Sequence, residues 1–195
     1  MHGSHPSFVL GFHGCDRSVG LRVLNGEEDL KPSTNIWDWL GSGIYFWEHD
    51  PELAMSYAKD VATRQQFAKG AIKEPFVLGA IIDLGKCLNT SNSKGIEILR
   101  NGHSGLVKAL EVAGALNELP RNIGENRRFL DCAVLEYVHQ QNKENDCTAF
   151  DTVRGAFQEG DPIYEGAYLT AKNHIQICVR NPECIRGYFL PRNVG

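Results

Sequence analysis

The chain has 195 residues, of which 42% are hydrophobic and 23% are charged. Its formal net charge of −4 gives no global attraction to nucleic acid, although a local basic rim is compatible with it. These values predict one soluble domain with a sizeable core; no apolar run approaches the length of a membrane span, and the N-terminus shows no secretory signal. The six cysteines form no Cys-x-x-Cys pair, which argues against a zinc site or a disulfide scaffold and predicts reduced thiols in a cytoplasmic protein.

In chain order, the first predicted elements are short. The apolar run over 8–12 predicts a core strand that ends in His13-Gly14, and the residues over 19–24 predict a short helix. The polar residues over 26–34 predict a loop, which leads to the most informative stretch of the chain.

That stretch, residues 37–58, begins with a glycine-containing turn and a strand. Gly41 and Gly43 permit a positive φ or a close approach of the backbone to another group. The β-branched and aromatic residues over 44–47 then predict a short buried strand that carries Tyr45.

A helix follows directly. Asp50 is placed as its N-cap, and the apolar periodicity predicts that the helix runs to Ala68 and is ended by Gly70. Tyr57 lies on its second turn, so Tyr45 and Tyr57 can face a common cleft and form a slot for a flat ligand. The alternative is ordinary strand–helix packing around two core tyrosines.

The rest of the chain predicts strands at both ends with helices between them, which is typical of a single α+β domain over residues 1–195. The predicted elements are a strand over 76–84, a turn-rich connection over 89–94, one or two helices over 96–119 interrupted at 102–105, a loop over 120–125, a helix over 127–142, an exposed loop over 155–166, and two strands over 175–179 and 185–190.

Three separated motifs carry a resemblance to a known family. They are Gly11-Phe12-His13-Gly14, then Gly43-Ile44-Tyr45-Phe46 with Tyr57, and finally the late strand over 173–178. In this order they resemble the ADP-ribosyltransferases of the His-Tyr-Glu class, typified by diphtheria toxin and the poly(ADP-ribose) polymerases. The resemblance implies a split antiparallel sheet, with helices between the first and last strands, and NAD as the co-substrate.

The resemblance also implies roles for single residues. His13 would hydrogen-bond a ribose hydroxyl of NAD, the backbone of Gly14 would pair with the nicotinamide carboxamide, and Tyr45 and Tyr57 would sandwich the nicotinamide ring. Ser33 would touch the adenine half. The residues implied to contact NAD are therefore His13, Gly14, Ser33, Gly43, Tyr45 and Tyr57.

The late strand departs from the family pattern. Where the class has a catalytic glutamate, this chain has Gln176, with His174 on the same face because strand side chains alternate. Within the class, loss of the glutamate is associated with transfer of single units or with loss of activity. Glu159 or Asp161, in the preceding loop, can supply the missing carboxylate, unless Glu159 is a solvated loop acid. The implied catalytic residues are His13, Tyr45, Gln176 and Glu159.

The leading hypothesis is a mono-ADP-ribosyltransferase that modifies an intracellular RNA, DNA or protein, in the manner of the stand-alone bacterial toxins of toxin–antitoxin and phage-defence modules. This hypothesis implies a macromolecular acceptor, a possible antitoxin partner and no membrane. The alternatives are a non-catalytic NAD- or ADP-ribose-binding module and an RNA 2′-phosphotransferase-like enzyme. Two further groups are assigned to surface positions: His103 to a loop, and Arg127-Arg128 to a solvated helix start that is also able to bind phosphate.

Overall fold

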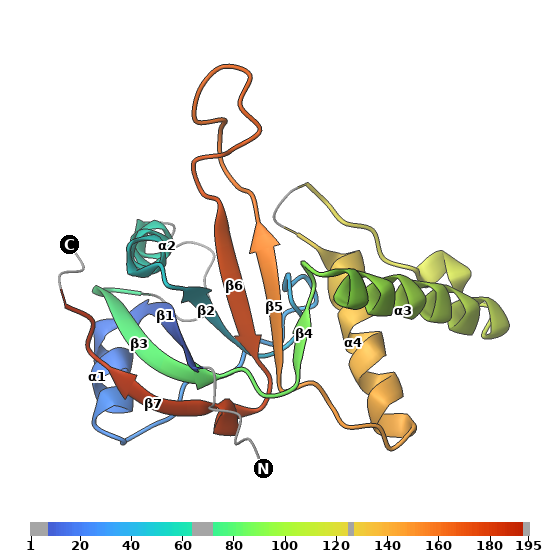
Figure 1. Ribbon diagram of the computed structural model, residues 1–195, viewed down its shortest axis with the longest axis horizontal. Helices are drawn as coiled ribbons and strands as arrows, with labels where there is room; N and C mark the ends of the chain where they lie inside the picture. The colour runs from blue at the N-terminus through green and yellow to red at the C-terminus, as the bar shows by residue number, and fades with distance from the viewer. Residues whose placement is uncertain (1–7, 64–71, 125–126, 193–195) are drawn as a thin grey trace, which may run out of the picture.

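The computed structural model describes residues 8–63, 72–124 and 127–192, and within them the chain forms an α+β fold, as predicted (Figure 1). The strands are β1 (Phe8–Asp16), β2 (Ile44–Glu48), β3 (Pro75–Asp83), β4 (Cys87–Asn89), β5 (Thr152–Phe157), β6 (His174–Val179) and β7 (Ile185–Phe189). The helices are α1 (Arg17–Leu24), α2 (Pro51–Thr63), α3 (Ser93–Val112), α4 (Phe129–Glu144) and the short 3-10 helices η1 (Leu116–Glu118) and η2 (Pro182–Cys184). The predicted end of α2 at Ala68 and Gly70 lies outside the described residues.

The strands form one mixed sheet in the order β4-β5-β6-β2-β1-β3-β7. Neighbouring strands are antiparallel except for β4 and β5, which run parallel, so the sheet is mixed at this edge, where the resemblance implied a split antiparallel sheet. The ladder between β1 and β3 extends from Phe8 to Asp16, whereas β1 and β2 share two residue pairs, Gly11 with Glu48 and Phe12 with Trp47. The ladder between β1 and β2, in the middle of the sheet, is therefore the shortest of its antiparallel ladders.

Different helices cover the two faces of this sheet. One face packs against α1 in a cluster that includes Phe46 at the centre of β2. The other face packs against α2 through Trp47 and against α4 through Cys178. Cys178 is the register partner of Tyr45, which lies two residues before Trp47 on β2. Because side chains along a strand alternate, α2 and α4 cover the same face at different places.

Two predicted boundaries are corrected. β1 continues through His13 and Gly14 to Asp16, because β3 pairs with it along this whole length. The loop predicted over 155–166 begins as strand: β5 runs to Phe157, and Gly155 lies within it. A Cβ on Gly155 would lie 2.8 Å from Thr90 Oγ1, so this glycine serves close packing rather than a turn.

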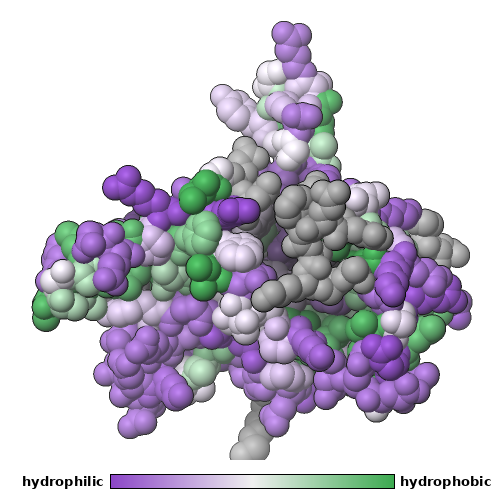
Figure 2. Space-filling view, turned by 180° about the vertical axis from the view of Figure 1, so that it is seen from behind, coloured by the Kyte–Doolittle hydropathy of each residue, from purple (hydrophilic) through white to green (hydrophobic). Residues whose placement is uncertain are grey.

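Residues 158–173, here called the arm, connect β5 to β6 and project from the body of the molecule (Figures 1 and 2). The arm is a paired structure rather than an open loop. Glu159 and Lys172 exchange two backbone hydrogen bonds, of 2.9 and 3.3 Å, and further out the N–H of Ile163 donates to the carbonyl of Leu169. The arm thus continues the β5–β6 ladder and fixes its first residues relative to the sheet.

Helix α3 is continuous from Ser93 to Val112, so the predicted interruption at 102–105 is wrong. A Cβ on Gly102 would lie 2.4 Å from Val138 Cγ2, and one on Gly105 would lie 2.9 Å from the ring of Tyr137. Both contacts are with α4. These glycines therefore permit the close approach of two helices, and the glycine content of this segment does not mark a break.

Replacing Gly102 with alanine is expected to lower the free energy of unfolding by about 1–3 kcal/mol, because the added methyl overpacks the contact with Val138. Helix propensity alone predicts the opposite sign, a gain of about 1 kcal/mol. Chemical denaturation measures the difference, with the exposed neighbour Asn101→Ala as a control expected to stay within about 0.5 kcal/mol of wild type. A Gly102→Ala protein more stable than wild type would contradict the close packing of α3 on α4.

Candidate active site

A cleft of about 620 Å³ lies on the face of the sheet that α2 and α4 share. Its walls come from β1, the loop before β2, β2 itself, α2, the base of the arm and β6. All but two of the site residues predicted from the sequence, Gly14 and Asp161, line it. Those that line it are His13, Ser33, Gly43, Tyr45, Tyr57, Glu159 and Gln176.

The strand register places residues of four strands side by side on the face of the sheet that carries the cleft. Phe12 of β1 is opposite Trp47 of β2, Trp47 is opposite Gln176 of β6, and Gln176 is opposite Gly155 of β5. Opposed residues of neighbouring strands point to the same face. Gln176 therefore faces the cleft beside an aromatic wall, whereas its partner Gly155 is closely packed against Thr90 and Leu40.

His13 bridges the two strands at the point where the β1–β2 ladder has ended. Its Nδ1–H donates to the backbone carbonyl of Tyr45 over 2.8 Å. Burial lowers the pKa of His13 below its ordinary value of 6.5, which the hydrogen bond to Tyr45 offsets only in part. The ring is thus neutral near pH 7, and because Nδ1 carries the proton, Nε2 is left as a hydrogen-bond acceptor.

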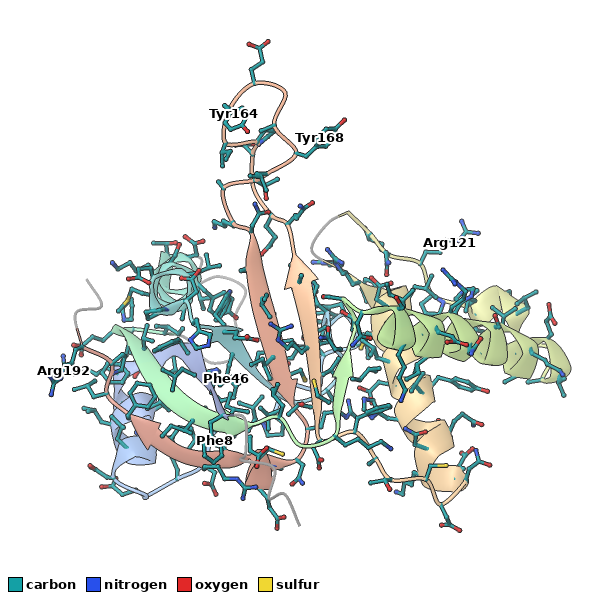
Figure 3. All side chains as sticks on the ribbon, in the orientation of Figure 1. Phe8, Phe46, Arg121, Tyr164, Tyr168 and Arg192 are labelled. Atoms are coloured by element: carbon teal, nitrogen blue, oxygen red, sulfur yellow. The ribbon has the colours of Figure 1, made fainter. Side chains whose placement is uncertain are left out.

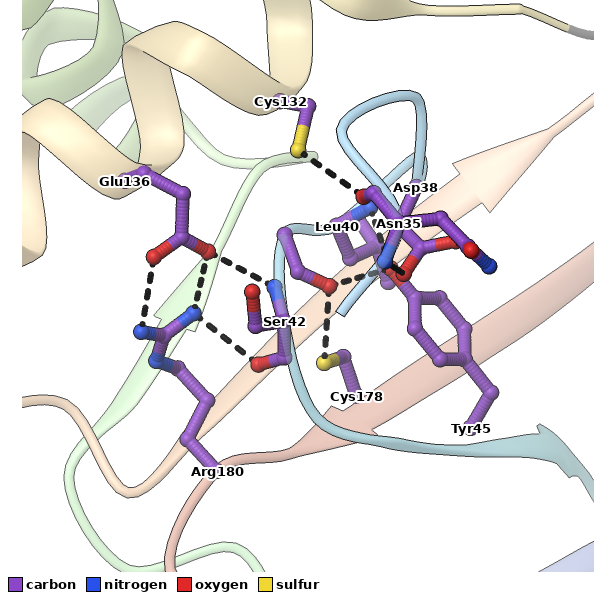
Figure 4. A network of polar contacts seen from close by, with 10 residues as sticks. Asn35, Asp38, Leu40, Ser42, Tyr45, Cys132, Glu136, Cys178 and Arg180 are labelled. Atoms are coloured by element: carbon purple, nitrogen blue, oxygen red, sulfur yellow. Dashed lines mark hydrogen bonds and ion pairs between the residues drawn. The ribbon is translucent and has the colours of Figure 1, made fainter. Parts of the chain in front are cut away.

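Tyr45 is anchored through its hydroxyl, so its ring is held at one position in the cleft wall (Figure 4). The hydroxyl donates to the carbonyl of Gly41 over 2.6 Å and accepts the N–H of Leu40 over 2.9 Å. Burial raises the pKa of Tyr45 far above its ordinary value, so the hydroxyl stays protonated. These contacts fix the turn before β2 against the strand that follows it.

The same turn is tied to α4 and to the end of β6 by an ion pair. Arg180 makes two contacts with the carboxylate of Glu136, of 2.7 and 3.1 Å, and donates to the carbonyl of Ser42 over 2.9 Å. Glu136 in turn accepts the N–H of Ser42 over 2.7 Å (Figure 4). Burial alone would raise the pKa of Glu136, but the hydrogen bonds from Arg180 and Ser42 outweigh it and lower that pKa. The turn that carries Gly41 and Gly43 is therefore held in place by Glu136 of α4 and by Arg180.

Tyr57 has a different environment. The residue is 47% exposed, and its ring lies against Trp47, with the ring centroids 5.0 Å apart. Trp47, which also lines the cleft, is inclined by 44° to the ring of Tyr57. The sequence pattern did not identify Trp47 as a wall, although its position two residues after Tyr45 puts both on one face of β2.

Gln176, His174 and Glu159 form a small polar cluster at the base of the arm. The Nδ1–H of His174 donates to the carbonyl of Lys172 over 2.8 Å, which leaves Nε2 to accept from the amide nitrogen of Gln176 at 3.0 Å. The carboxylate of Glu159 lies 3.7 Å from the same Nε2. In this arrangement the amide nitrogen of Gln176 is directed at His174, so its carbonyl oxygen remains free to accept a hydrogen bond from a ligand.

The outcome for the remaining predicted residues is mixed. Gly14 does not line the cleft: a Cβ there would lie 2.3 Å from the carbonyl oxygen of Ala54, so this glycine lets α2 approach β1. Ser33 pairs with Gly43 through two backbone hydrogen bonds, of 2.8 and 3.0 Å. Asp161 lies further out on the arm, where its carbonyl accepts the N–H of Ala171, and it is not among the lining residues of the cleft.

Two lysines of the cleft were also not identified from the sequence. Lys31 and Lys172 both line it, and Lys172 forms an ion pair of 3.6 Å with Asp60 of α2, another lining residue. This contact joins the arm to α2 across the cleft. No local pattern around either lysine points to a site, because their proximity depends on how the loop and the arm fold.

None of the models of known protein families matches the chain, and a search of curated proteins finds no match. Within residues 8–63, 72–124 and 127–192, no group of three or more His, Cys, Asp or Glu side chains is placed to hold a metal ion. Among the described helices, none has both the length and the apolar character needed to cross a membrane.

Proposed function

We propose that the protein is an NAD-dependent mono-ADP-ribosyltransferase that acts on a macromolecule. The observation that carries the proposal is that one cleft collects His13, Tyr45, Tyr57 and Gln176 from four separate elements, in the chain order expected for the His-Tyr-Glu class. The cleft volume of about 620 Å³ suits a ligand of the size of NAD.

In this proposal each part of NAD meets side chains of complementary chemistry in the cleft. Nε2 of neutral His13 and the carbonyl oxygen of Gln176 accept hydrogen bonds from ribose hydroxyls. The ring of Tyr45 and the Trp47–Tyr57 pair hold the nicotinamide flat. Lys31 and Lys172 attract the pyrophosphate.

The transfer step breaks the bond between the nicotinamide nitrogen and C1′ of the ribose. The bonding electron pair leaves with neutral nicotinamide, and the ribose becomes an oxocarbenium-like cation. An acceptor nucleophile then bonds to C1′ and loses a proton. Glu159, whose carboxylate lies beside His174 at the cleft, stabilises the cation and accepts this proton.

The competing candidate is a non-catalytic NAD- or ADP-ribose-binding module, favoured by the amide of Gln176 at the position where the class has a carboxylate. Glu159 favours the enzyme, because its side chain is 27% exposed and lines the cleft beside Gln176, rather than extending into solvent. A toxic effect on the host cell, an antitoxin partner and a cytoplasmic location stay predictions of the enzyme proposal.

Incubation with NAD labelled in its adenylate phosphate, together with a cell lysate, tests the proposal. Label is expected to appear in one class of macromolecule, as single ADP-ribose units, with release of at least one nicotinamide for each unit transferred. A protein that retains labelled NAD in the cleft but transfers no label and releases no nicotinamide is a binding module instead.

The affinity for NAD is expected to respond to acid through His13. Because its pKa lies below 6.5, the dissociation constant should stay constant from about pH 8 to about pH 6.5 and rise as the pH falls further, when Nε2 is protonated and can no longer accept a hydrogen bond. Calorimetric titration over this range measures the effect. His13→Gln, whose amide does not titrate, is the control, and a fall in affinity that persists unchanged in this variant would contradict the role of His13.

Two variants of Gln176 separate a hydrogen-bonding role from a charge requirement. Gln176→Ala is expected to slow nicotinamide release about tenfold, the equivalent of one neutral hydrogen bond. Gln176→Glu is expected to keep or raise NAD hydrolysis, because a carboxylate stabilises the oxocarbenium better than an amide does. Nicotinamide release without acceptor measures both. If Gln176→Ala behaves as wild type, Gln176 is a strand residue without a role in the reaction.

A further inference from the structure

A second cavity, of about 360 Å³, lies next to the cleft, between α3, α4 and the end of β5. Its floor is apolar: Leu40, Leu135 and Phe157 are all buried. Its rim is polar and basic, with Arg100 and His103 from one face of α3 and Arg128 from the residue before α4. His103 thus lies on a helix and beside a cavity, whereas the sequence placed it in a loop.

Trp39 forms the wall between the two cavities, because it lines both of them. Its ring lies 4.8 Å from the ring of Phe157, and the guanidinium of Arg128 lies 4.3 Å above it. The same guanidinium lies 5.4 Å from the Phe157 ring. A ligand that occupies the second cavity therefore contacts the stacked Arg128 and Trp39, and its neighbouring part reaches the cleft past this wall.

The charge of the lining favours an anion. Arg100 and Arg128 are cationic, and among the described residues that line the cavity the acidic one is Asp131, which lies 3.9 Å from Arg128. The side chains of Arg100 and His103 are exposed at the rim, where a phosphate can reach them without desolvation of a buried charge. An aromatic and aliphatic floor under a guanidinium rim is the combination that binds a base by stacking and its phosphate by charge.

We propose that the second cavity binds a nucleotide unit of a single-stranded nucleic acid, which is the acceptor of the transfer reaction. A single strand fits because an unpaired base can enter the cavity, whereas a base in a duplex is held in the stack. The strand passes Trp39, so the nucleotide next to the bound one enters the cleft. The role of the strand as acceptor rests on the proposed function, whereas its binding in the second cavity does not.

Binding is therefore tested without NAD, by fluorescence anisotropy of labelled single-stranded RNA and DNA oligonucleotides of about 12 nucleotides. Arg100→Glu is expected to weaken binding about tenfold. It should also reduce the slope of log K against log salt concentration by about 0.7, the value for one phosphate contact of a single strand. Arg192→Glu, the same change at the opposite end of the molecule from α3 (Figure 3), should leave both quantities unchanged. The RNA and DNA arms identify which strand is preferred.

Nicotinamide release without acceptor separates this inference from the proposed function, because Arg100 lines the second cavity and does not line the cleft assigned to NAD. Wild-type protein that releases nicotinamide but binds neither oligonucleotide would overturn the nucleic-acid inference and leave the transferase proposal standing. Equal binding by Arg100→Glu and wild type would also overturn it. In a lysate, label that enters protein and is not reduced by added oligonucleotides would overturn it as well. Thermal unfolding of Arg100→Glu shows whether the exposed substitution leaves the fold intact.

Discussion

Glu159→Gln is expected to slow nicotinamide release from NAD by about 100- to 1000-fold, because the amide removes the negative charge beside the developing oxocarbenium. The dissociation constant for NAD should change little, since the charge matters most in the transition state. The structure motivates the change through the position of Glu159, which lines the cleft and lies 3.7 Å from His174 Nε2. Single-turnover kinetics and NAD titration measure the two quantities separately.

The matched control is Glu165→Gln, the same chemical change at an exposed position nearer the tip of the arm, which also carries Tyr164 and Tyr168 (Figure 3). This variant should hydrolyse NAD as wild type does, because it keeps the cleft unchanged. If Glu159→Gln and Glu165→Gln have equal rates, Glu159 is a solvated acid and the cleft has no catalytic carboxylate on the arm.

Tyr45→Ala is expected to reduce NAD turnover by at least about 100-fold, because the nicotinamide loses a wall and its orientation in the cleft. The variant should also lose about 3–5 kcal/mol of stability, since a large, partly buried ring is removed and the turn before β2 loses an anchor. Circular dichroism and thermal unfolding are therefore measured beside nicotinamide release, at a temperature where the variant is folded.

Tyr45→Phe distinguishes the ring from the hydroxyl. The ring remains, while the hydrogen bonds to the carbonyl of Gly41 and from the N–H of Leu40 are lost, so stability should fall by about 1–2 kcal/mol with at most a tenfold loss of turnover. A Tyr45→Phe protein as inactive as Tyr45→Ala would mean that the anchored turn, and not stacking, determines activity.

The apolar patterns of the sequence predicted the strands that carry His13, Tyr45 and Gln176, but that the three residues lie together was implied by the resemblance to a known class; all three line the cleft. The α+β class followed from the same patterns. β4 was missed because its three residues, Cys87–Asn89, are too few for an alternation to be detected. Parallel pairing of β4 with β5 depends on contacts far apart in the chain, which no local pattern encodes.

Glycines produced the other errors. Gly102 and Gly155 were interpreted as breaks, yet each lies inside a regular element at a close contact with a neighbouring segment. Gly14, predicted to meet the carboxamide of NAD, has a packing role under Ala54 that local sequence cannot distinguish from a ligand contact. A glycine in the sequence indicates that another group can approach the backbone closely at that position. Only the fold determines whether that group is a neighbouring segment or a ligand.

The central claim is that this cleft binds NAD and cleaves its nicotinamide–ribose bond. Purified wild-type protein and His13→Ala are incubated with NAD, and free nicotinamide is measured over time by chromatography. We predict steady release of nicotinamide by wild type, faster in the presence of the acceptor, and a rate at least about 100-fold lower for folded His13→Ala. Equal rates for the two proteins, or no release by wild type with or without a lysate, would contradict the account.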